Sequence, residues 1–449
     1  MQCYNVKWSF YVDQSREITF ALRPLAASLL IVSAAMLTAC GGSSSSDNPH
    51  EHTDIDTAGR LALFDTDASQ LKVLDLDNSE VLASMAMDGE APRLYASPGN
   101  RYAVAIQRGE DLVSFVDGGL YTEDHGDHMH DYAETPSMLS LTLNDHKPTH
   151  YSAGESQGVV FFDGGEAATS KVTVFSDATL GSGSTVASLP LENNMHGVAK
   201  MIDGHLFVTY RDSSITDTTL PAAVERYHLD GSDFEFEERY TEACPRLHGA
   251  AANAHSLGFG CSDGVLVIDL HETGYPATKL DNPEGLAEGA RIGTLVANHD
   301  VEELVGIAGD RLFVIHPESA AEVYHELELG EGVGRLAQGF TTHGEVFYVL
   351  GDDGGLRLFN PAHDWELITT AELMDAPGDE DTLSVTVSAD QERLFVLHNQ
   401  SVIEVDATDG DIVRTIDLGF SASAIAWLGL AEAGHDHGDE HDHEEEHSH

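Results

Sequence analysis

Apolar and polar positions alternate in short runs from residue 60 to residue 428, and almost no stretch repeats with the period of a helix. The runs are separated by Asp-Gly, Gly-Asp and Asn-containing turns. Alternation with a period of two places successive side chains on opposite faces of a β-strand, whereas an amphipathic helix repeats about every 3.6 residues. The pattern therefore predicts an all-β chain.

These runs recur as a larger unit with a period of about 40 to 55 residues, the length of a four-stranded propeller blade. The repeated runs are 206–210, 223–227 and 234–237, then 312–315 and 323–327, and then 394–397, 402–405 and 412–416. The expected starts of the innermost strands lie near Arg93, His150, His196, His248, Arg291, Arg335, Thr382 and Ser423. We predict a β-propeller of eight four-stranded blades, with seven blades or a pair of β-sandwiches as alternatives.

The two ends of the repeat region are expected to share one blade. Runs 61–65, 71–76 and 81–85 would dock beside residues 424–428, so that strands from both ends complete the last sheet. Such closure leaves no exposed sheet edge and ties the ring shut. The predicted propeller domain spans residues 59–430.

The N-terminal segment has the features of a bacterial export signal. Residues 25–39 form an apolar run that follows Arg16 and Arg23, and the run ends in Leu37-Thr38-Ala39-Cys40, which matches a lipobox. A Gly-Ser-rich stretch comes directly afterwards and is typical of a flexible tether. We predict a signal peptide at 1–39, lipidation of Cys40 and a tether at 40–58. The protein would then be periplasmic and lipid-anchored to a membrane of a Gram-negative envelope, with an ordinary secretory signal as the alternative.

Cleavage at this site would leave Cys244 and Cys261 as the cysteines of the mature domain. An oxidising compartment favours pairing, and a turn near Asn253 would place the two cysteines opposite each other across a hairpin. We predict a disulfide between them. Free thiols or cysteine ligands to a metal remain alternatives.

The charge of the chain excludes one class of partner and favours another. There are 77 acidic and 22 basic residues, giving a formal charge of −55. Nucleic-acid binding needs clustered Lys and Arg, so this class is excluded. A cation is the favoured partner, although a generally acidic surface also keeps a protein soluble.

The densest group of metal-ligand residues is the segment 124–131, between two strand-like runs of the first blade. Imidazole nitrogens and carboxylate oxygens together suit a divalent first-row ion, zinc above all. The candidate ligands are His125, His128, His130, Asp124 and Asp127. An insertion at a blade edge is expected to be long and mobile, and a solvated polar loop without metal is the alternative.

Three further histidines occupy matching positions in successive blades. His150, His196 and His248 each stand at the start of an expected innermost strand, where the blades meet around the channel. Three imidazoles at one point form a zinc site. The alternative is that they only form hydrogen bonds between neighbouring blades. Arg93, Arg291 and Arg335 stand at the equivalent positions of other blades, where they would hold an anion or pair with carboxylates.

The C-terminal residues 431–449 mix histidines with Asp and Glu and have no apolar face. Such a segment cannot fold alone and is expected to bind several ions weakly. An acidic solubilising tail without metal is the alternative. The tail's candidate ligands are His435, His437, His441, His443, His447 and His449.

The combination of propeller, export signal and His-Asp loop resembles the AztD-like family of periplasmic zinc chaperones that accompany a zinc ABC importer. The similarity spans about residues 55–430, and its most specific part is the stretch 123–132. The resemblance implies that the protein binds zinc and hands it to the solute-binding protein of the transporter. It also implies that the loop and channel histidines are the zinc ligands. The lipobox, the tether and the His-rich tail depart from a soluble chaperone and suggest a membrane-tethered version.

Two other functions remain open at the level of sequence. A metal-dependent propeller hydrolase or lactonase would need an open coordination position and a general base. The chain has no Ser-His-Asp signature or glycine-rich phosphate loop, so we expect a protein that is not an enzyme. A scaffold lipoprotein would leave the histidine tracts unexplained.

Overall fold

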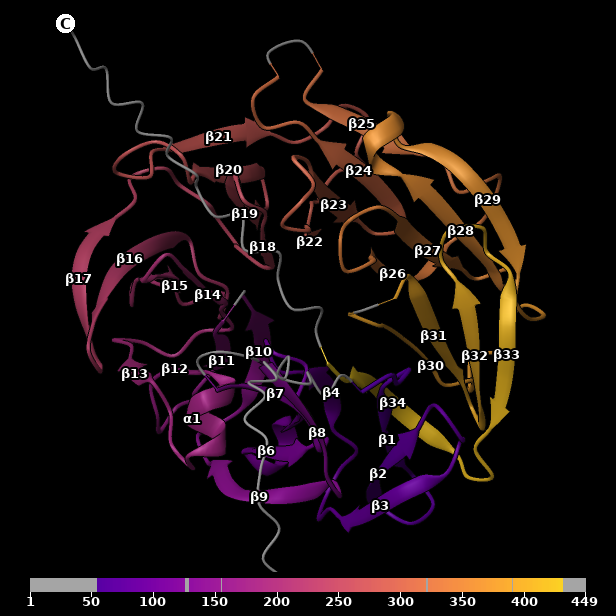
Figure 1. The fold of residues 1–449 in the computed structure, drawn as a ribbon. Coiled ribbons are helices and arrows are strands. Elements are labelled where there is room, and N and C mark those ends of the chain that lie inside the picture. Colours follow the sequence, from indigo (N-terminus) through magenta and orange to yellow (C-terminus); the bar gives the residue numbers. More distant parts are fainter. Residues whose placement is uncertain (1–54, 126–128, 155, 320–321, 390, 431–449) are drawn as a thin grey trace, which may run out of the picture. The chain divides into compact units, whose positions relative to one another are not determined.

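The computed structural model describes residues 55–125, 129–154, 156–319, 322–389 and 391–430. These residues form eight four-stranded antiparallel sheets and one two-stranded sheet. The sheets follow one another around a ring as the blades of a β-propeller (Figure 1). The predicted fold class and the predicted number of eight blades are therefore confirmed.

The first four blades contain strands that follow one another in sequence, apart from one inserted hairpin. Blade 1 consists of β4 (Arg93–Ala96), β5 (Tyr102–Gln107), β6 (Leu112–Asp117) and β9 (Ser137–Leu143), and the hairpin β7 (Leu120–Asp124) and β8 (Met129–Ala133) is inserted before β9. Blade 2 consists of β10 (Pro148–Ala153), β11 (Gly158–Phe162), β12 (Lys171–Phe175) and β13 (Ala187–Pro190). Blade 3 consists of β14 (Ala199–Ile202), β15 (His205–Tyr210), β16 (Ala223–Asp230) and β17 (Asp233–Arg239). Blade 4 consists of β18 (Ala250–Ala252), β19 (Ser256–Cys261), β20 (Gly264–Asp269) and β21 (Ala277–Asp281).

The remaining blades complete the ring, and the last one joins the two ends of the domain. Blade 5 consists of β22 (Thr294–Val296), β23 (Leu304–Ala308), β24 (Arg311–Ile315) and β25 (Tyr324–Leu327). Blade 6 consists of β26 (Arg335–Phe340), β27 (Phe347–Gly351), β28 (Gly355–Asn360) and β29 (Glu366–Glu372). Blade 7 consists of β30 (Leu383–Val387), β31 (Arg393–His398), β32 (Ser401–Asp406) and β33 (Ile412–Asp417). Blade 8 consists of β34 (Ala422–Leu428), β1 (Arg60–Asp65), β2 (Gln70–Asp75) and β3 (Val81–Ala86).

Helices are few and short among the described residues. They are α1 (Asp177–Gly181) and the 3-10 helices η1 (Arg108–Glu110) and η2 (Pro361–His363). No helix in this described part of the chain has the length and apolar character needed to span a membrane.

Blade 8 confirms the predicted closure. Strand β1 pairs with β2 on one side and with β34 on the other, and Leu61 lies opposite Trp427. The Trp427 ring is buried, and its Nε1 donates a hydrogen bond to the carbonyl oxygen of Ala58 at 3.1 Å. Both ends of the domain are thereby held in one sheet, beside each other in Figure 1.

The core is divided among the junctions between neighbouring blades. One apolar cluster, for example, joins blades 1 and 2 through Tyr102, Phe115, Phe162 and Phe175. Middle strands such as β5 are buried along their whole length, and their sequences are therefore almost continuously apolar. In the outer strand β17, by contrast, Phe residues alternate with exposed Glu residues. This packing fixes the inner strands rigidly and so positions the residues at the channel.

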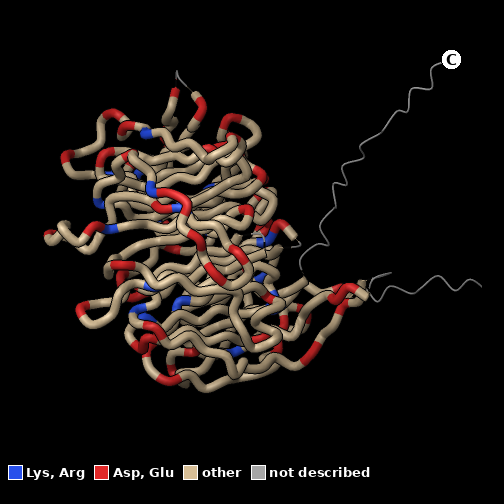
Figure 2. Tube along the Cα trace, turned by 90° about the vertical axis from the view of Figure 1, so that its left-hand side faces the viewer, with Lys and Arg blue, Asp and Glu red and all other residues tan. Residues whose placement is uncertain are grey.

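Acidic residues are spread over the side of the molecule shown in Figure 2, and the few Lys and Arg residues are scattered among them. The distribution agrees with a chain that has 77 acidic and 22 basic residues.

The two cysteines of the domain form a disulfide, Cys244–Cys261. Cys261 ends β19, as expected, but the partner strand β18 begins only at Ala250. Cys244 therefore lies in the segment before the hairpin, where its N–H donates to the carbonyl oxygen of Ala222. The disulfide ties this segment to the strand rather than crossing the hairpin itself.

Candidate metal centre

The structure brings His150, His196 and His248 together at the inner ends of blades 2, 3 and 4. Nε2 of His196 lies 3.3 Å from Nε2 of His150 and 3.2 Å from Nε2 of His248. The donor nitrogens of all three lie within 4.8 Å of one another. Three side chains that are 46 and 52 residues apart in sequence thus meet at one point.

Local backbone features orient the imidazole ring of each of the three histidines. A register shift between Pro148 and His150 interrupts the pairing of β10 with β11, and such bulges re-aim a side chain. His196 and His248 stand just before their strands, where their N–H groups donate to the carbonyl oxygens of Thr219 and Gly260.

A glycine follows His196 and His248, and in each case a larger residue would collide with neighbouring atoms. A Cβ on Gly197 would collide with the hydroxyl of Thr209, which itself accepts a hydrogen bond from the backbone of Val198. A Cβ on Gly249, whose φ is +35°, would lie 2.8 Å from the carbonyl oxygen of Gly293. The repeated His-Gly pair therefore allows the strand start to lie close to its neighbours while the histidine faces the axis.

Hydrogen bonds on the far side of two rings fix which nitrogen carries the proton. Nδ1 of His248 lies 2.7 Å from the carbonyl oxygen of Gly293, and Nδ1 of His196 lies 2.9 Å from Oδ2 of Asp163. Because both partners are acceptors, each Nδ1 must be the donor. In the neutral rings, Nε2 of His196 and Nε2 of His248 then present lone pairs to each other across 3.2 Å. Two facing lone pairs repel each other unless a proton or a metal ion lies between them.

The spacing of these nitrogens fits zinc. Ligands on a tetrahedral zinc ion with Zn–N bonds of about 2.0–2.1 Å lie about 3.3 Å apart. The two measured Nε2 separations are 3.3 and 3.2 Å. Two of the three pairs thus already have the spacing that zinc needs, and the third pair, His150 and His248, lies within 4.8 Å. Three imidazoles would leave a fourth position for water or another ligand.

Burial keeps the site ready to coordinate a metal. Burial and the neighbouring imidazoles of His196 and His248 lower the pKa of His150 to about 4. Burial also lowers the pKa of His248, although the hydrogen bond to Gly293 opposes the shift. A neutral imidazole is the form that binds metal, so both ligands are available at neutral pH, and His150 remains so well below it.

Asp163 is a part of the site that the sequence analysis missed. Burial by itself would raise the pKa of its carboxyl, but hydrogen bonds from His196 and Arg108 outweigh this effect and keep the pKa below the usual value. Arg108 donates from its guanidinium to Oδ2 of Asp163 at 2.7 Å and to Thr149 at 3.0 Å. A carboxylate behind a ligating imidazole orients the ring and raises its basicity. Asp163 directly follows the apolar strand β11, as turn residues often do. Its position in the sequence therefore did not indicate a role beside a metal ligand.

A cavity of about 190 Å³ adjoins two of the three histidines. It is lined by His150 and His248 and by residues of the inner strands, among them Tyr151 and Lys200. Burial lowers the pKa of Lys200 to about 8. The side chain of His196 is 27% exposed. The site is therefore partly sheltered and still accessible to an arriving or departing ion.

The arginines at equivalent positions of other blades do not bind carboxylates in the contacts that the structure describes. Arg291 donates to the carbonyl oxygen of Arg246, and Arg335 donates to the carbonyl oxygen of Gly309 and to the side chain of Gln338. The positive charges of Arg93 and Arg291 contribute to the lowered pKa values of His150 and His248, respectively. These two arginines therefore help to keep the histidines neutral.

The described residues of segment 124–131 belong to the hairpin β7–β8, where an edge loop was expected. Tyr121 and Tyr132 face each other across it and their rings stack at 5.0 Å, while Arg101 lies over the Tyr121 ring at 3.6 Å. Asp131 accepts hydrogen bonds from the hydroxyl of Thr122 and the N–H of Ile55. The base of the hairpin is therefore anchored, and Asp131 has a structural role.

Two candidate ligands lie side by side on this hairpin. The ring centroids of His125 and His130 are 5.0 Å apart, and Nε2 of His125 lies 3.1 Å from the hydroxyl of Tyr132. Asp124, the last residue of β7, pairs with Met129 of β8.

Several predicted residues lie outside the described residues. They are Asp127 and His128, the predicted lipidation site Cys40, and the tail histidines His435, His437, His441, His443, His447 and His449.

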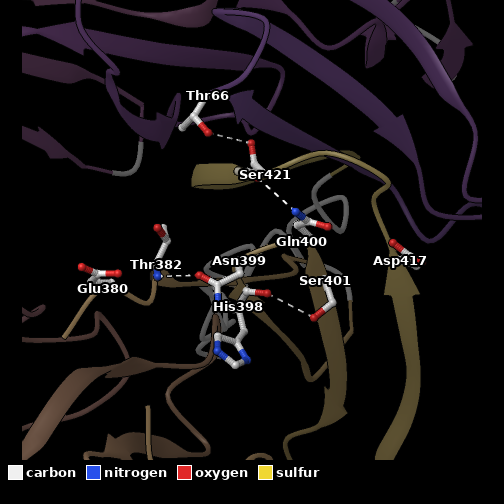
Figure 3. Close-up of a pocket in the computed structure, with 10 residues that line it drawn as sticks. Thr66, Glu380, Thr382, His398, Asn399, Gln400, Ser401, Asp417 and Ser421 are labelled. Carbon is white, nitrogen blue, oxygen red and sulfur yellow. Dashed lines mark hydrogen bonds between the residues drawn. The ribbon is translucent and has the colours of Figure 1, made fainter. Parts of the chain in front are cut away.

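Another hollow, of about 680 Å³, lies at the junction of blades 7 and 8 (Figure 3). Its polar side chains bond to one another and to nearby backbone: Thr66 and Gln400 both contact Ser421, and the backbone N–H of Thr382 donates to the side chain of Asn399. These contacts stabilise the blade junction. They do not converge on a common point as the channel histidines do.

Comparison with known proteins identifies a zinc chaperone among the relatives of this chain. No family model matches the chain. A curated relative, the zinc chaperone AztD of Citrobacter koseri, is 26% identical over 262 residues, which is 58% of this chain and 60% of that protein. The expected resemblance to AztD is confirmed. The matched region thus spans less than two thirds of the length of AztD.

Solved structures extend the comparison to the whole propeller. Apo AztD from Citrobacter koseri superposes with a TM-score of 0.71 at 22% identity, covering 84% of this chain and 99% of AztD. A second structure of Citrobacter koseri AztD gives 0.70 at 21% identity, covering 84% and 100%. The dihydro-heme d1 dehydrogenase NirN gives 0.56 at 11% identity, covering 85% and 78%. AztD therefore shares the fold of this chain, and an enzyme shares the propeller architecture.

Proposed function

We propose that this protein is a periplasmic zinc metallochaperone that is not an enzyme. It captures zinc with His150, His196 and His248 and passes the ion to the solute-binding protein of a zinc ABC importer. The observation that carries the proposal is the pair of Nε2 lone pairs of His196 and His248, which face each other at 3.2 Å with both Nδ1 atoms engaged elsewhere. The similarity to the zinc chaperone AztD supports the same ion and the same role.

The chemistry of the site suits a protein that must also release its ion. Three imidazoles bind zinc without a thiolate and leave one position open. An incoming ligand from a partner can occupy that position before the histidines let go. The 27% exposure of the His196 side chain and the adjoining cavity give such a ligand access. Release then proceeds by exchange of ligands, with no need for the propeller to open.

The hairpin and the ends of the chain are assigned supporting roles. His125 and His130 of the hairpin form a more exposed pair, which, with His128, Asp124 and Asp127, collects zinc near the channel mouth. The histidine-rich tail 431–449 does the same more weakly. Lipidation of Cys40 and the tether 40–58 keep the propeller at the membrane of a Gram-negative envelope, where the importer is located.

A hydrolase would use the open coordination position for an activated water. It would also need a general base beside that water. Asp163 is bonded to Nδ1 of His196, on the far side of that ring from the Nε2 that faces the other histidines, so it does not stand beside such a water. Asp163 therefore orients a ligand, which favours binding and transfer over hydrolysis.

The test is direct transfer from the full chain. The zinc-loaded chain is mixed with the apo solute-binding protein of the importer in the presence of a chelator that traps free zinc, and zinc on the acceptor is measured over time. We expect rapid transfer by the parent chain and by H363A, a control at an exposed histidine of η2. The triple variant H150A/H196A/H248A should lose the tight zinc and the transfer.

Two results would overturn the proposal in different ways. Unchanged transfer by the triple variant would show that the channel is not the donor site. Tight binding in the channel with no passage to the acceptor would leave a zinc protein that is not a chaperone. The variant H125A/H130A should retain tight zinc and load more slowly from dilute zinc.

A further inference from the structure

A second group of metal-ligand side chains lies on strands β15, β16 and β17 of blade 3. His205 is the first residue of β15 and lies directly opposite His228 of β16. Strand β16 pairs in turn with β17, and a bulge leaves Glu237 without a directly opposed residue, because Arg226 pairs with Glu238 and Tyr227 pairs with Phe236. A bulge re-aims the side chain it carries. One donor atom from each of His205, His228 and Glu237 lies within 4.8 Å of the others.

This group is separate from the channel site. His196 stands before β14, the chain then crosses the blade along β14, and the last residue of that strand, Ile202, pairs with His205. His205 therefore lies at the opposite end of the inner strands from His196. In Figure 1, β16 and β17 lie at the outer side of the blade, away from the ring axis.

Neighbouring groups hold the donors in place. Oε2 of Glu237 accepts from Nε of Arg226 at 2.7 Å and lies 3.0 Å from Nδ1 of His205. Arg226 is itself fixed by the carbonyl oxygen of Gly274 at 2.8 Å. The ring of His205 packs against Tyr275 with centroids 5.2 Å apart. Such contacts orient ligands before a metal arrives.

The carboxylate is ionised as a ligand must be. Burial would raise the pKa of Glu237, but the hydrogen bond and charge of Arg226, with His205, lower it overall. The charge of Arg226 is also met by Glu238 at 3.1 Å, so it is not left uncompensated beside a bound cation. His228 and Glu237 are exposed and the His205 side chain is 18% exposed, which lets a hydrated ion reach all three.

We propose that His205, His228 and Glu237 form a second site for a divalent first-row metal ion, with zinc as the expected occupant. Two imidazoles and a carboxylate are a donor set that such ions prefer, and water would complete the shell. Donors within 4.8 Å must close to about 3.3 Å, which exposed side chains achieve by small rotations. This site is weaker than the channel site because it is more exposed and lies next to a guanidinium group. The proposal does not depend on the chaperone function.

Anomalous diffraction at the zinc edge locates the ion directly. Crystals of the full chain are saturated with zinc, and difference maps are calculated from data above and below the edge. We expect a peak at about 2.0–2.2 Å from one nitrogen of His205, one nitrogen of His228 and an oxygen of Glu237. The absence of a peak at these three side chains under zinc saturation would overturn the proposal, whatever the channel contains.

A solution measurement separates a built site from an ion held by crystal packing. Equilibrium dialysis gives the number of zinc ions on the full chain, on H228A, on E237Q and on the control H363A. His228 and Glu237 are exposed, so the two variants should fold, and circular dichroism checks this. H228A should bind one ion fewer than H363A, and E237Q should bind the ion more weakly. Equal numbers for H228A and H363A would contradict the proposal even if a crystal shows a peak.

Discussion

Oδ2 of Asp163 lies 2.9 Å from Nδ1 of His196 and 2.7 Å from the guanidinium of Arg108. One buried carboxylate thus connects a candidate zinc ligand of blade 3 to a short helix of blade 1. The contact sets the tautomer of His196, and through it the direction of the lone pair that faces His248. The affinity of the channel for zinc should depend on a residue that does not contact the ion.

Replacing Asp163 by Asn is expected to weaken zinc binding by about 10- to 100-fold without changing the number of ions bound. An amide can donate to Nδ1 of His196 and so favour the tautomer that carries its proton on Nε2, where the metal must bind. Competition against a chelator measures the affinity. The control is E166Q, three residues along the chain at an exposed carboxylate, which should leave the affinity unchanged. Equal affinities for D163N and E166Q would show that Asp163 does not act through His196.

Zinc in the channel is expected to withstand a lower pH than zinc on exposed histidines. The pKa of His150 is lowered to about 4 and that of His248 is also lowered, chiefly by burial. Protons and zinc compete for the same imidazole nitrogen, so a lowered ligand pKa moves release to a lower pH. The channel should therefore still hold zinc at a pH where the hairpin and the tail have released theirs.

Dialysis of the full chain and of H150A/H196A/H248A at decreasing pH checks this expectation. The difference between the two curves isolates the channel zinc from zinc on the tail and hairpin. A difference that vanishes in step with the zinc of the triple variant would contradict the prediction.

Removal of the Cys244–Cys261 disulfide should destabilise the propeller without removing the metal. The two residues are 17 apart in sequence, and a loop of this size gives about 3 kcal/mol in the chain-entropy model. Both side chains are buried next to the core between blades 3 and 4, so C244A/C261A also loses some packing. Thermal unfolding should show a lower Tm, with zinc stoichiometry retained. A reductant should lower the Tm of the parent chain and leave that of the double variant unchanged.

Closure of the ring should depend strongly on Trp427. Its side chain is 1% exposed, packs in the core between blades 7 and 8, and bonds to Ala58 near the start of the domain. Trp427→Ala should cost about 3–5 kcal/mol of unfolding free energy, the usual range for a buried aromatic side chain. Chemical denaturation measures the loss. Val413→Ala, on the exposed face of β33, should change the unfolding free energy by no more than about 0.5 kcal/mol, and similar losses in both variants would argue against a closing role for Trp427.

Much of the fold followed from the sequence because the determinants are local and repeated. Alternating apolar runs define strands, and a regular period defines blades. The inner strands begin within a few residues of the expected positions, as β4 at Arg93 and β26 at Arg335 show. The same register placed His150, His196 and His248 at equivalent positions, since repeats that share a register also share a direction toward the axis.

The tertiary structure decided what the side chains do once they meet. Asp163 and the carbonyl of Gly293 come from other parts of the chain and set the tautomers of His196 and His248. No sequence pattern marks them, because a hydrogen bond between blades depends on packing and leaves no periodic signal. The dense histidines of segment 124–131 drew attention first, yet the described residues of that segment belong to an anchored hairpin. The sequence by itself thus determined the blades and which histidines face the axis, whereas only the packing of one blade against the next decided which nitrogens can bind an ion.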